Sequence, residues 1–276
     1  MTDLGTNPPG GDLPPEIDTS MPTPARMYDY WLGGKDNFPA DRRAGDAVLE
    51  VFPEMRRGVR QNRALLGRMV RYLAGEAGIR QFLDIGTGLP TKDNTHEVAQ
   101  AVAPESRVVY VDNDPLVLVH ARALLQSSAR GVTKYVEADL RDPDKILQGA
   151  TETLDFNEPV AITLLMILML IEDEDAYEVV SRLMAAVPSG SYLAISHPAG
   201  DIDSGGEISK AYERLEKLMP DRPTLRSKDQ IARLFDGLEM VEPGLVQLHR
   251  WRPDPGDADS VLHYDVPAYA GVGRKP

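Results

Sequence analysis

The sequence predicts an α/β fold: an open, doubly wound and mostly parallel sheet with helices on both faces. From residue 80 onward, short apolar or β-branched runs alternate with helical patterns in five strand–helix units, and a last pair of strand-like runs follows. The first run, QFLDIG, passes directly into a turn with two glycines, as in nucleotide-binding sheets. Together these observations favour a Rossmann-like architecture.

The chain before residue 80 is organised differently. Residues 1–20 are rich in Pro, Gly and Asp and predict a weakly ordered tail. Residues 21–78 predict a helical extension that caps the sheet, because apolar side chains recur there at helical spacing. Gly33 and Gly34 interrupt this pattern, so a loop is expected over 33–39. The Rossmann-like domain is then expected to occupy residues 79–276.

The sheet elements follow in order from the period of the apolar residues. Strands are expected at 81–84, 107–111, 133–138, 160–165, 191–196, 245–251 and 268–272. Helices are expected at 95–103, 115–124, 172–187, 208–219 and 231–235. Asp114 and Pro115 place an N-cap before a first-turn proline, and Ser227 and Gln230 have the spacing of a capping box.

Composition excludes several classes of protein. The 276 residues carry a formal net charge of −13, which argues against a nucleic-acid partner because phosphate binding needs clustered Lys and Arg. The chain has no cysteine, which removes thiolate nucleophiles and Cys-ligated metals. The longest apolar run, residues 160–171, is too short to cross a bilayer, and residues 1–20 lack the basic and apolar regions expected of a signal peptide. We therefore expect a cytoplasmic protein without a membrane segment or a metal site.

An acid follows each of the first three strands, namely Asp84, Asp112 and Asp139. In an open parallel sheet the carboxyl ends of the strands form the ligand-binding edge, so these acids are expected near the ligand. Gly86 and Gly88 would let the backbone approach that ligand closely.

The glycine turn departs from the dinucleotide fingerprint, because Thr91 stands where a third glycine is expected. Asp112 lies 24 residues after Gly88, close to the spacing of a ribose-binding acid.

The acid before the glycines distinguishes two cofactors. A dinucleotide would bring a pyrophosphate to the turn, where Asp84 repels it. S-adenosylmethionine carries an ammonium and a sulfonium instead, which a carboxylate stabilises. Asp112 then suits the ribose hydroxyls, and Asp139 suits the adenine amino group. The residues favour S-adenosylmethionine over NAD.

The chain resembles class I, Rossmann-like S-adenosylmethionine-dependent methyltransferases. More narrowly, it resembles a bacterial S-adenosyl methyltransferase-like family formerly catalogued as a domain of unknown function. The resemblance rests on PARMYDYWLGGKDNF, RQNRALLGRMVRYL, FLDIGTGLPT, HEVAQ, VVYVDNDP, DGLEMVEPGLV, RWRPD and YAGVGRKP, in this order along nearly the whole chain. It implies a seven-stranded sheet whose last strand is antiparallel. The cofactor-site residues so expected are Asp84, Gly86, Thr87, Gly88, Asp112, Asn113, Asp139, Leu140 (through its backbone) and Met166.

One segment departs from the family pattern. Members often carry a His after the fourth strand, whereas this chain has Ile167-Leu168-Met169-Leu170. Either a general base lies elsewhere, or that His serves packing, or this member does not catalyse the family reaction. Met166 and Ile167 at the strand exit are expected to wall the methyl-transfer region, or simply to belong to the core.

Four further residues are candidates for the substrate or the lid. Tyr30, with Tyr28 and Trp31, could cover the cofactor, or it could pack within the helical extension. Asn37 lies in the loop after the two glycines and could reach the ligand.

Arg63 could pair with the methionine carboxylate or form a surface ion pair. His197 could face the substrate or be a satisfied residue at a strand end.

The sequence thus predicts a methyltransferase that uses S-adenosylmethionine and acts on a small molecule. A non-catalytic binding or regulatory protein on the same fold is the alternative that the altered segment at residues 167–170 leaves open. An NAD-dependent oxidoreductase is a third, which Asp84 disfavours.

Overall fold

The sheet of the computed structural model has the predicted open, mostly parallel order. The structure describes residues 17–124, 128–202, 205–219, 223–256 and 264–276. The main strand order is β3-β2-β1-β4-β5-β8-β6, and a short β7 also pairs with β8. The strands are β1 (Gln81–Ile85), β2 (Arg107–Asp112), β3 (Val132–Glu137), β4 (Ala161–Leu165), β5 (Tyr192–Pro198), β6 (Glu239–Met240), β7 (Val246–Gln247) and β8 (Ala268–Arg274). The last strand, β8, is antiparallel to β5, as expected.

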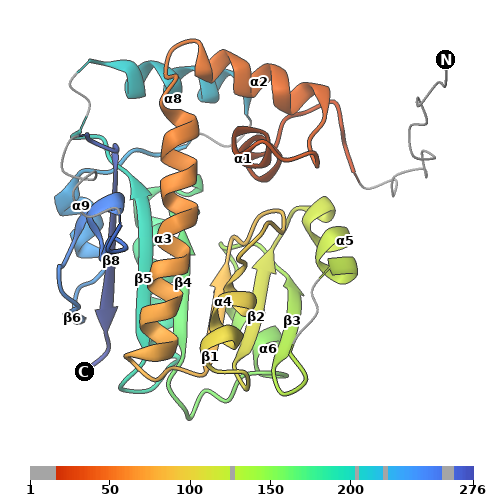
Figure 1. Cartoon of the computed structure of the whole chain (residues 1–276). Helices are drawn as coiled ribbons and strands as arrows, with labels where there is room; N and C mark the ends of the chain where they lie inside the picture. Colours follow the sequence, from red (N-terminus) through yellow and green to blue (C-terminus); the bar gives the residue numbers. More distant parts are fainter. Residues whose placement is uncertain (1–16, 125–127, 203–204, 220–222, 257–263) are drawn as a thin grey trace.

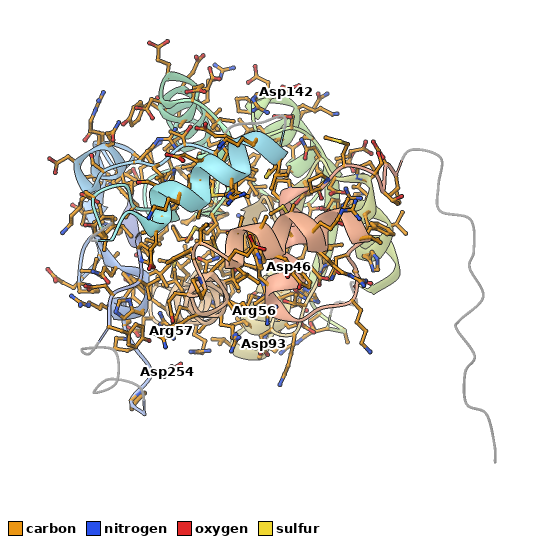
Figure 2. All side chains as sticks on the ribbon, turned by 90° about the horizontal axis from the view of Figure 1, so that it is seen from above. Asp46, Arg56, Arg57, Asp93, Asp142 and Asp254 are labelled. Carbon is orange, nitrogen blue, oxygen red and sulfur yellow. The ribbon has the colours of Figure 1, made fainter. Side chains whose placement is uncertain are left out.

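Helices cover both faces of the sheet and its carboxyl edge (Figure 1). They are α1 (Pro24–Leu32), α2 (Pro39–Leu49), α3 (Met55–Gly75), α4 (Thr95–Val102), α5 (Pro115–Leu124), α6 (Pro143–Ala150), α7 (Asp173–Ala185), α8 (Glu207–Leu218) and α9 (Lys228–Arg233), with 3-10 turns η1 (Leu168–Leu170) and η2 (Leu248–Arg250). Helices α1, α2 and α8 lie beyond the carboxyl ends of the parallel strands, and the view from above shows α2 and α8 side by side (Figures 1 and 2). These three helices, called the roof below, therefore cover the edge at which an open sheet binds its ligand.

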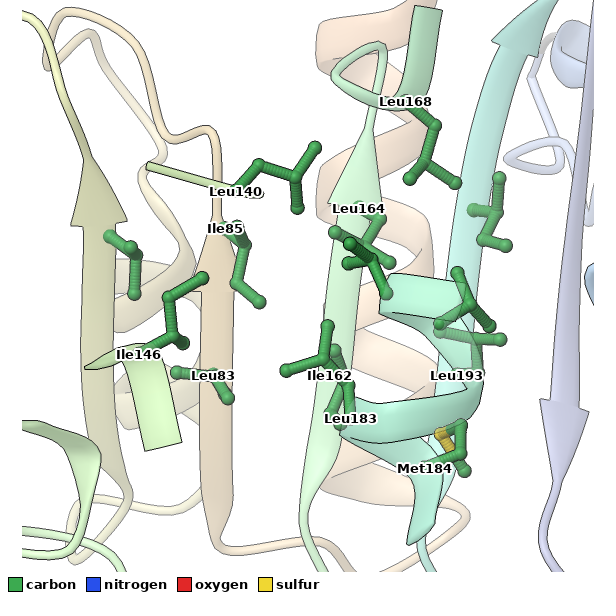
Figure 3. Packing of buried hydrophobic residues seen from close by; sticks show 14 of the residues in the cluster. Leu83, Ile85, Leu140, Ile146, Ile162, Leu164, Leu168, Leu183, Met184 and Leu193 are labelled. Atoms are coloured by element: carbon green, nitrogen blue, oxygen red, sulfur yellow. The ribbon is translucent and has the colours of Figure 1, made fainter. Parts of the chain in front are cut away.

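Two apolar layers hold the helices on the sheet. On one face, Leu83 and Ile162 of neighbouring strands pack with Ile146 of α6 and Leu183 of α7 (Figure 3). The opposite face packs against Leu65, Met69 and the rest of the apolar stripe of α3. Helix α3 therefore belongs to the helix layer of the sheet as well as to the N-terminal extension.

Local capping signals place several helix ends where the sequence predicts them. Asp114 Oδ1 accepts a hydrogen bond from Leu116 N at 2.8 Å, with Pro115 opening α5. The predicted capping box at α9 is formed, since Ser227 N donates to Gln230 Oε1 at 2.9 Å and Gln230 N donates to Ser227 Oγ at 3.3 Å.

The predicted pattern differs from the structure at three elements. The strand expected at residues 245–251 is only the two-residue β7 followed by η2, because Arg68 takes the carbonyl oxygens of Leu248 and Trp251 at 2.8 and 2.9 Å. Helix α6 and strand β6 were not foreseen. Of the tail expected over 1–20, residues 1–16 lie outside the described residues, and the carbonyl oxygen of Asp18 accepts a hydrogen bond from Arg26 Nη1 of α1 at 2.9 Å.

Within the described part of the chain, no helix is both long and apolar enough to cross a membrane.

Candidate functional site

A cavity of about 510 Å³ opens between the carboxyl edge of the sheet and the roof of helices. Its volume falls in the range of roughly 300–1,000 Å³ that is usual for small-molecule sites. One half is polar and is lined by the ends of β1 and β2, including Asp84, Gly88 and Asp112. The other half, the apolar compartment, is lined by Met27, Trp31, Phe52, Ile208, Tyr212 and Leu215.

Asp84 is buried at the base of the polar half. Its Oδ1 accepts a hydrogen bond from Thr163 Oγ1 and its Oδ2 accepts one from Thr95 Oγ1, both at 2.6 Å. Burial raises the pKa of this carboxyl, and the two threonine hydroxyls partly oppose the rise. Each carboxylate oxygen can accept more than one hydrogen bond, so Asp84 still has acceptor capacity for a cation in the cavity.

The two glycines of the turn serve different purposes. Both have left-handed backbone angles, with φ of 74° at Gly86 and 63° at Gly88. A Cβ atom at Gly86 would lie 2.4 Å from Cγ1 of Ile167, so this glycine allows the turn after β1 to pack against the exit of β4. A Cβ at Gly88 would meet no protein atom within 4 Å, and Gly88 lines the cavity. Gly88 thus leaves a space that the protein itself does not fill.

Asp112 braces the glycine turn from the end of β2. Its Oδ2 accepts a hydrogen bond from Gly88 N at 2.8 Å, and its Oδ1 accepts bonds from Asn113 N at 2.9 Å and Asp114 N at 3.0 Å. Burial raises the pKa of Asp112 to about 6, although these backbone donors oppose the rise. The carboxyl lines the cavity together with Thr87 and Asn113.

Arg63 reaches the polar half from α3. Its Nη2 donates to Asn94 Oδ1 at 2.9 Å and lies 3.3 Å from the carbonyl oxygens of Lys92 and Asp93. Its Nε is buried and has no hydrogen-bond partner within the described residues. A buried guanidinium N–H without an acceptor is costly, so this donor suits an anionic group of a ligand in the cavity.

Asp139 and Leu140 do not line the cavity. Asp139 Oδ2 accepts a hydrogen bond from Asn113 Nδ2 at 3.0 Å, so it contacts the site through Asn113. The side chain of Leu140 lies in the core (Figure 3).

Met166 does line the cavity, and its φ of 58° is unusual for a residue with a side chain. Its N–H donates to Ser196 O at 2.9 Å, which holds this strained turn at the exit of β4.

His197 is not brought to the cavity. Strand β5 extends to Pro198, so His197 lies within the strand and is fully buried. Its Nε2 lies 2.6 Å from Nη1 of Arg226 and therefore accepts, while Nδ1 donates to Pro198 O at 2.8 Å. Burial and the neighbouring guanidinium lower the pKa of His197 to about 3, so it is a neutral structural acceptor.

Tyr30 and Asn37 also lie outside the cavity lining. Tyr30 points away from the site, where its hydroxyl donates to Asp46 Oδ1 at 2.5 Å. Asn37 Nδ2 donates to Asp29 Oδ2 at 2.7 Å and its Oδ1 accepts from Arg42 Nε at 2.7 Å. Their hydrogen bonds are internal to the N-terminal helices.

The other two aromatic residues of the predicted lid, Tyr28 and Trp31, do line the cavity. The hydroxyl of Tyr28 donates to Val59 O and accepts from Asn62 Nδ2, both at 3.0 Å.

Several residues of the site were not predicted from the sequence. Helix α8 was expected as an amphipathic helix, but nothing local showed that Ile208, Tyr212 and Leu215 face a cavity. Thr163 was not singled out, because its place opposite Asp84 follows from the register of β4 on β1.

Comparison with known proteins places the chain in a family. The model of a family described as S-adenosyl methyltransferase matches residues 11–276. A DUF574 family protein from Streptomyces avermitilis is 47% identical, with 94% of this chain and 99% of that chain covered and a TM-score of 0.90. A proposed methyltransferase from Thermobifida fusca is 42% identical, with 95% and 98% covered and a TM-score of 0.85.

A more distant structure shares only the fold. An S-adenosylmethionine-dependent methyltransferase from Anabaena variabilis is 15% identical, with 95% of this chain and 98% of that chain covered and a TM-score of 0.52. No curated protein matches the chain.

Proposed function

Since the chain belongs to the S-adenosyl methyltransferase family, we propose that its cavity binds S-adenosylmethionine in the polar half and a small-molecule methyl acceptor in the apolar compartment. Arg63 Nε carries this proposal most directly, because it is a buried donor aimed at no protein acceptor. Because the chain belongs to this family, we no longer retain the hypothesis of an NAD-dependent oxidoreductase.

The nucleoside part of the cofactor fits the turn between β1 and β2. Asp112 is an anionic acceptor beside the glycine turn, and a ribose presents two neighbouring hydroxyl donors. Gly88 leaves open space next to that carboxylate, where a side chain would otherwise stand. Asp139, linked to Asn113, extends the site toward the position proposed for the adenine amino group.

The amino-acid part of the cofactor fits Asp84 and Arg63. Asp84 is a buried carboxylate suited to the ammonium, and Arg63 Nε suits the carboxylate. Opposite charges at the two ends of a zwitterion would fix its direction in the cavity.

When bound, S-adenosylmethionine supplies a methyl group on a sulfonium, and a lone pair of the acceptor takes that methyl while the C–S electron pair stays on sulfur. The residues of this chain then have to orient the two reactants and exclude water, which accounts for much of such catalysis. The described lining contains no histidine that could stand in for the His expected after the fourth strand. The apolar lining residues beyond the glycine turn support an enzyme over a non-catalytic binder, because they offer contacts to an apolar acceptor.

Calorimetric titration tests the proposal. The protein should bind S-adenosylmethionine or S-adenosylhomocysteine with a stoichiometry of one ligand per chain. It should not bind NADH, whose pyrophosphate would be repelled by Asp84. Absence of heat with both adenosyl ligands at millimolar concentration would exclude the proposed function.

Replacing Arg63 by Met should weaken S-adenosylhomocysteine binding about tenfold, because one charge-assisted hydrogen bond to the carboxylate is lost. Adenosine has no carboxylate, so its affinity should stay within twofold of the wild-type value. Arg60→Met, an exposed position on the same helix, serves as the matched control. Equal weakening of both ligands by Arg63→Met would contradict the role given to Arg63.

Adenosine binding should depend on pH through Asp112. Its pKa of about 6 means that the free site is increasingly protonated as the pH falls below that value. Only the carboxylate accepts from both ribose hydroxyls, so affinity should be flat above about pH 7 and fall up to about tenfold per pH unit well below the pKa. Calorimetry on the wild type and Asp112→Asn checks this, since the variant should show no such dependence. A wild-type affinity that is constant down to about pH 5 would contradict it.

A further inference from the structure

Helix α8, which lies outside the strand–helix alternation of the sheet, forms one wall of the apolar compartment. Ile208, Tyr212 and Leu215 recur at the spacing of one helical face and line the cavity from α8. The opposite face of α8 is charged and exposed, for example at Glu213 and Lys217. Met27 and Trp31 of α1 form the facing wall. These walls of the compartment are thus apolar apart from the hydroxyl of Tyr212.

Charged lining residues offer no partner to an anion in this compartment. Among the described lining residues the acids are Asp18, Asp29, Asp84, Asp112 and Asp114, and the bases are Arg26 and Arg63. The excess of acids gives the cavity a negative potential, which disfavours phosphorylated or carboxylated acceptors.

Each of the three side-chain nitrogens of Arg26 already donates a hydrogen bond within the protein. Its Nε donates to Thr23 Oγ1 at 2.9 Å, Nη1 to Asp18 O at 2.9 Å and Nη2 to Met21 O at 2.6 Å. It also pairs with Asp41 at 3.3 Å, and both side chains are buried. Arg63 lies in the polar half, beside the glycine turn. An anionic acceptor would therefore be buried without a counter-charge, which is strongly unfavourable.

One polar group in the compartment is weakly satisfied. The hydroxyl of Tyr212 donates to the thioether sulfur of Met169 at 3.7 Å. A thioether is a poor acceptor, so an oxygen or nitrogen of a bound molecule would take this hydrogen bond in its place. Burial raises the pKa of Tyr212, which keeps the hydroxyl a neutral donor.

We propose that the methyl acceptor is a mainly apolar small molecule without an anionic group, which packs against α8 and accepts a hydrogen bond from the Tyr212 hydroxyl. This inference rests on the proposed function, because it assigns the cofactor to the other half of the cavity.

Two fluorescent probes with the same ring system test the class of acceptor. N-phenyl-1-naphthylamine is neutral, and 8-anilinonaphthalene-1-sulfonate adds one sulfonate. With the protein saturated by S-adenosylhomocysteine, the neutral probe should bind at one saturable site, and the sulfonate should bind at least about tenfold more weakly. Equal affinity for the two probes, or no saturable binding of the neutral one, would overturn the inference.

Variants of Leu215, with Glu213→Gln as a control, test whether the neutral probe binds in the apolar compartment. Leu215→Phe fills the compartment and should weaken the neutral probe about tenfold, whereas Glu213→Gln on the outer face of α8 should leave it unchanged. Leu215→Ala is the second variant, which enlarges the compartment and should also change probe affinity. Calorimetry with S-adenosylhomocysteine on the same samples separates the outcomes. If the wild type does not bind S-adenosylhomocysteine, the proposed function is refuted. If S-adenosylhomocysteine binds but neither Leu215 variant changes the affinity for the neutral probe, only the proposed class of acceptor is refuted.

The hydrogen bond from Tyr212 is tested by 1-naphthol, measured by its displacement of the neutral probe. Tyr212→Phe should weaken 1-naphthol about fivefold and leave N-phenyl-1-naphthylamine within twofold, since one neutral hydrogen bond is lost. Unchanged 1-naphthol affinity would overturn the role of the hydroxyl.

Discussion

Replacing Gly88 by Ala should lower the affinity for S-adenosylmethionine at least about 100-fold while the protein stays folded. The new methyl group meets no protein atom within 4 Å, so it projects into the space proposed for the cofactor. The left-handed backbone makes alanine unfavourable here by about 1–2 kcal/mol, which a protein of this size tolerates. Calorimetry gives the affinity, and a thermal melt shows that the fold persists.

Gly86→Ala provides the contrast to Gly88→Ala. Its backbone is also left-handed, so the conformational cost is similar, but its Cβ would lie 2.4 Å from Ile167 Cγ1. Overpacking adds about 1–3 kcal/mol, so the melting temperature should fall clearly further than in Gly88→Ala. If Gly88→Ala binds normally, or if it is the less stable of the two variants, the distinction between the two glycines is wrong.

Replacing Asp112 by Ala should weaken S-adenosylhomocysteine and adenosine by the same factor, about 100-fold, because both ligands lose the hydrogen bonds from the ribose hydroxyls to a charged acceptor. The common factor separates this residue from Arg63, whose loss should affect only the ligand with a carboxylate. Calorimetry with both ligands measures the two ratios.

Asp112 also holds the glycine turn, so the loss in Asp112→Ala could arise from a displaced Gly88. Asp112→Asn keeps the shape and one acceptor oxygen and should weaken adenosine by a smaller factor, about tenfold. Asp236→Asn, at an exposed position between α9 and β6, is the control for a change of charge alone. Wild-type affinity in Asp112→Ala would remove this residue from the site.

Local signals were sufficient for much of the fold. The caps at Asp114 and at Ser227 with Gln230 could be predicted because each depends on residues within one helical turn. The glycine turn and the acids Asp84 and Asp112 could be placed on one sheet edge because parallel strands end together. The family resemblance supplied the antiparallel last strand, β8.

The remaining features depend on contacts between distant parts of the chain. His197 is withdrawn from the cavity by Arg226, which is 29 residues further along and also donates to Leu168 O at 2.7 Å. Tyr30 points away from the cavity because its hydroxyl donates a hydrogen bond to Asp46 of α2. The apolar face of α8 looked like ordinary core, since the same pattern lines a cavity or fills one. Whether such a face lines a cavity or is filled by core side chains depends on how the helices pack in three dimensions.

A crystal structure of the protein with S-adenosylhomocysteine tests the central claim most directly. The account predicts the ribose hydroxyls on Asp112, the homocysteine carboxylate on Arg63 Nε and the sulfur facing the apolar compartment. Electron density for the ligand outside this cavity, or inside it with the ribose turned away from Asp112, would contradict the account.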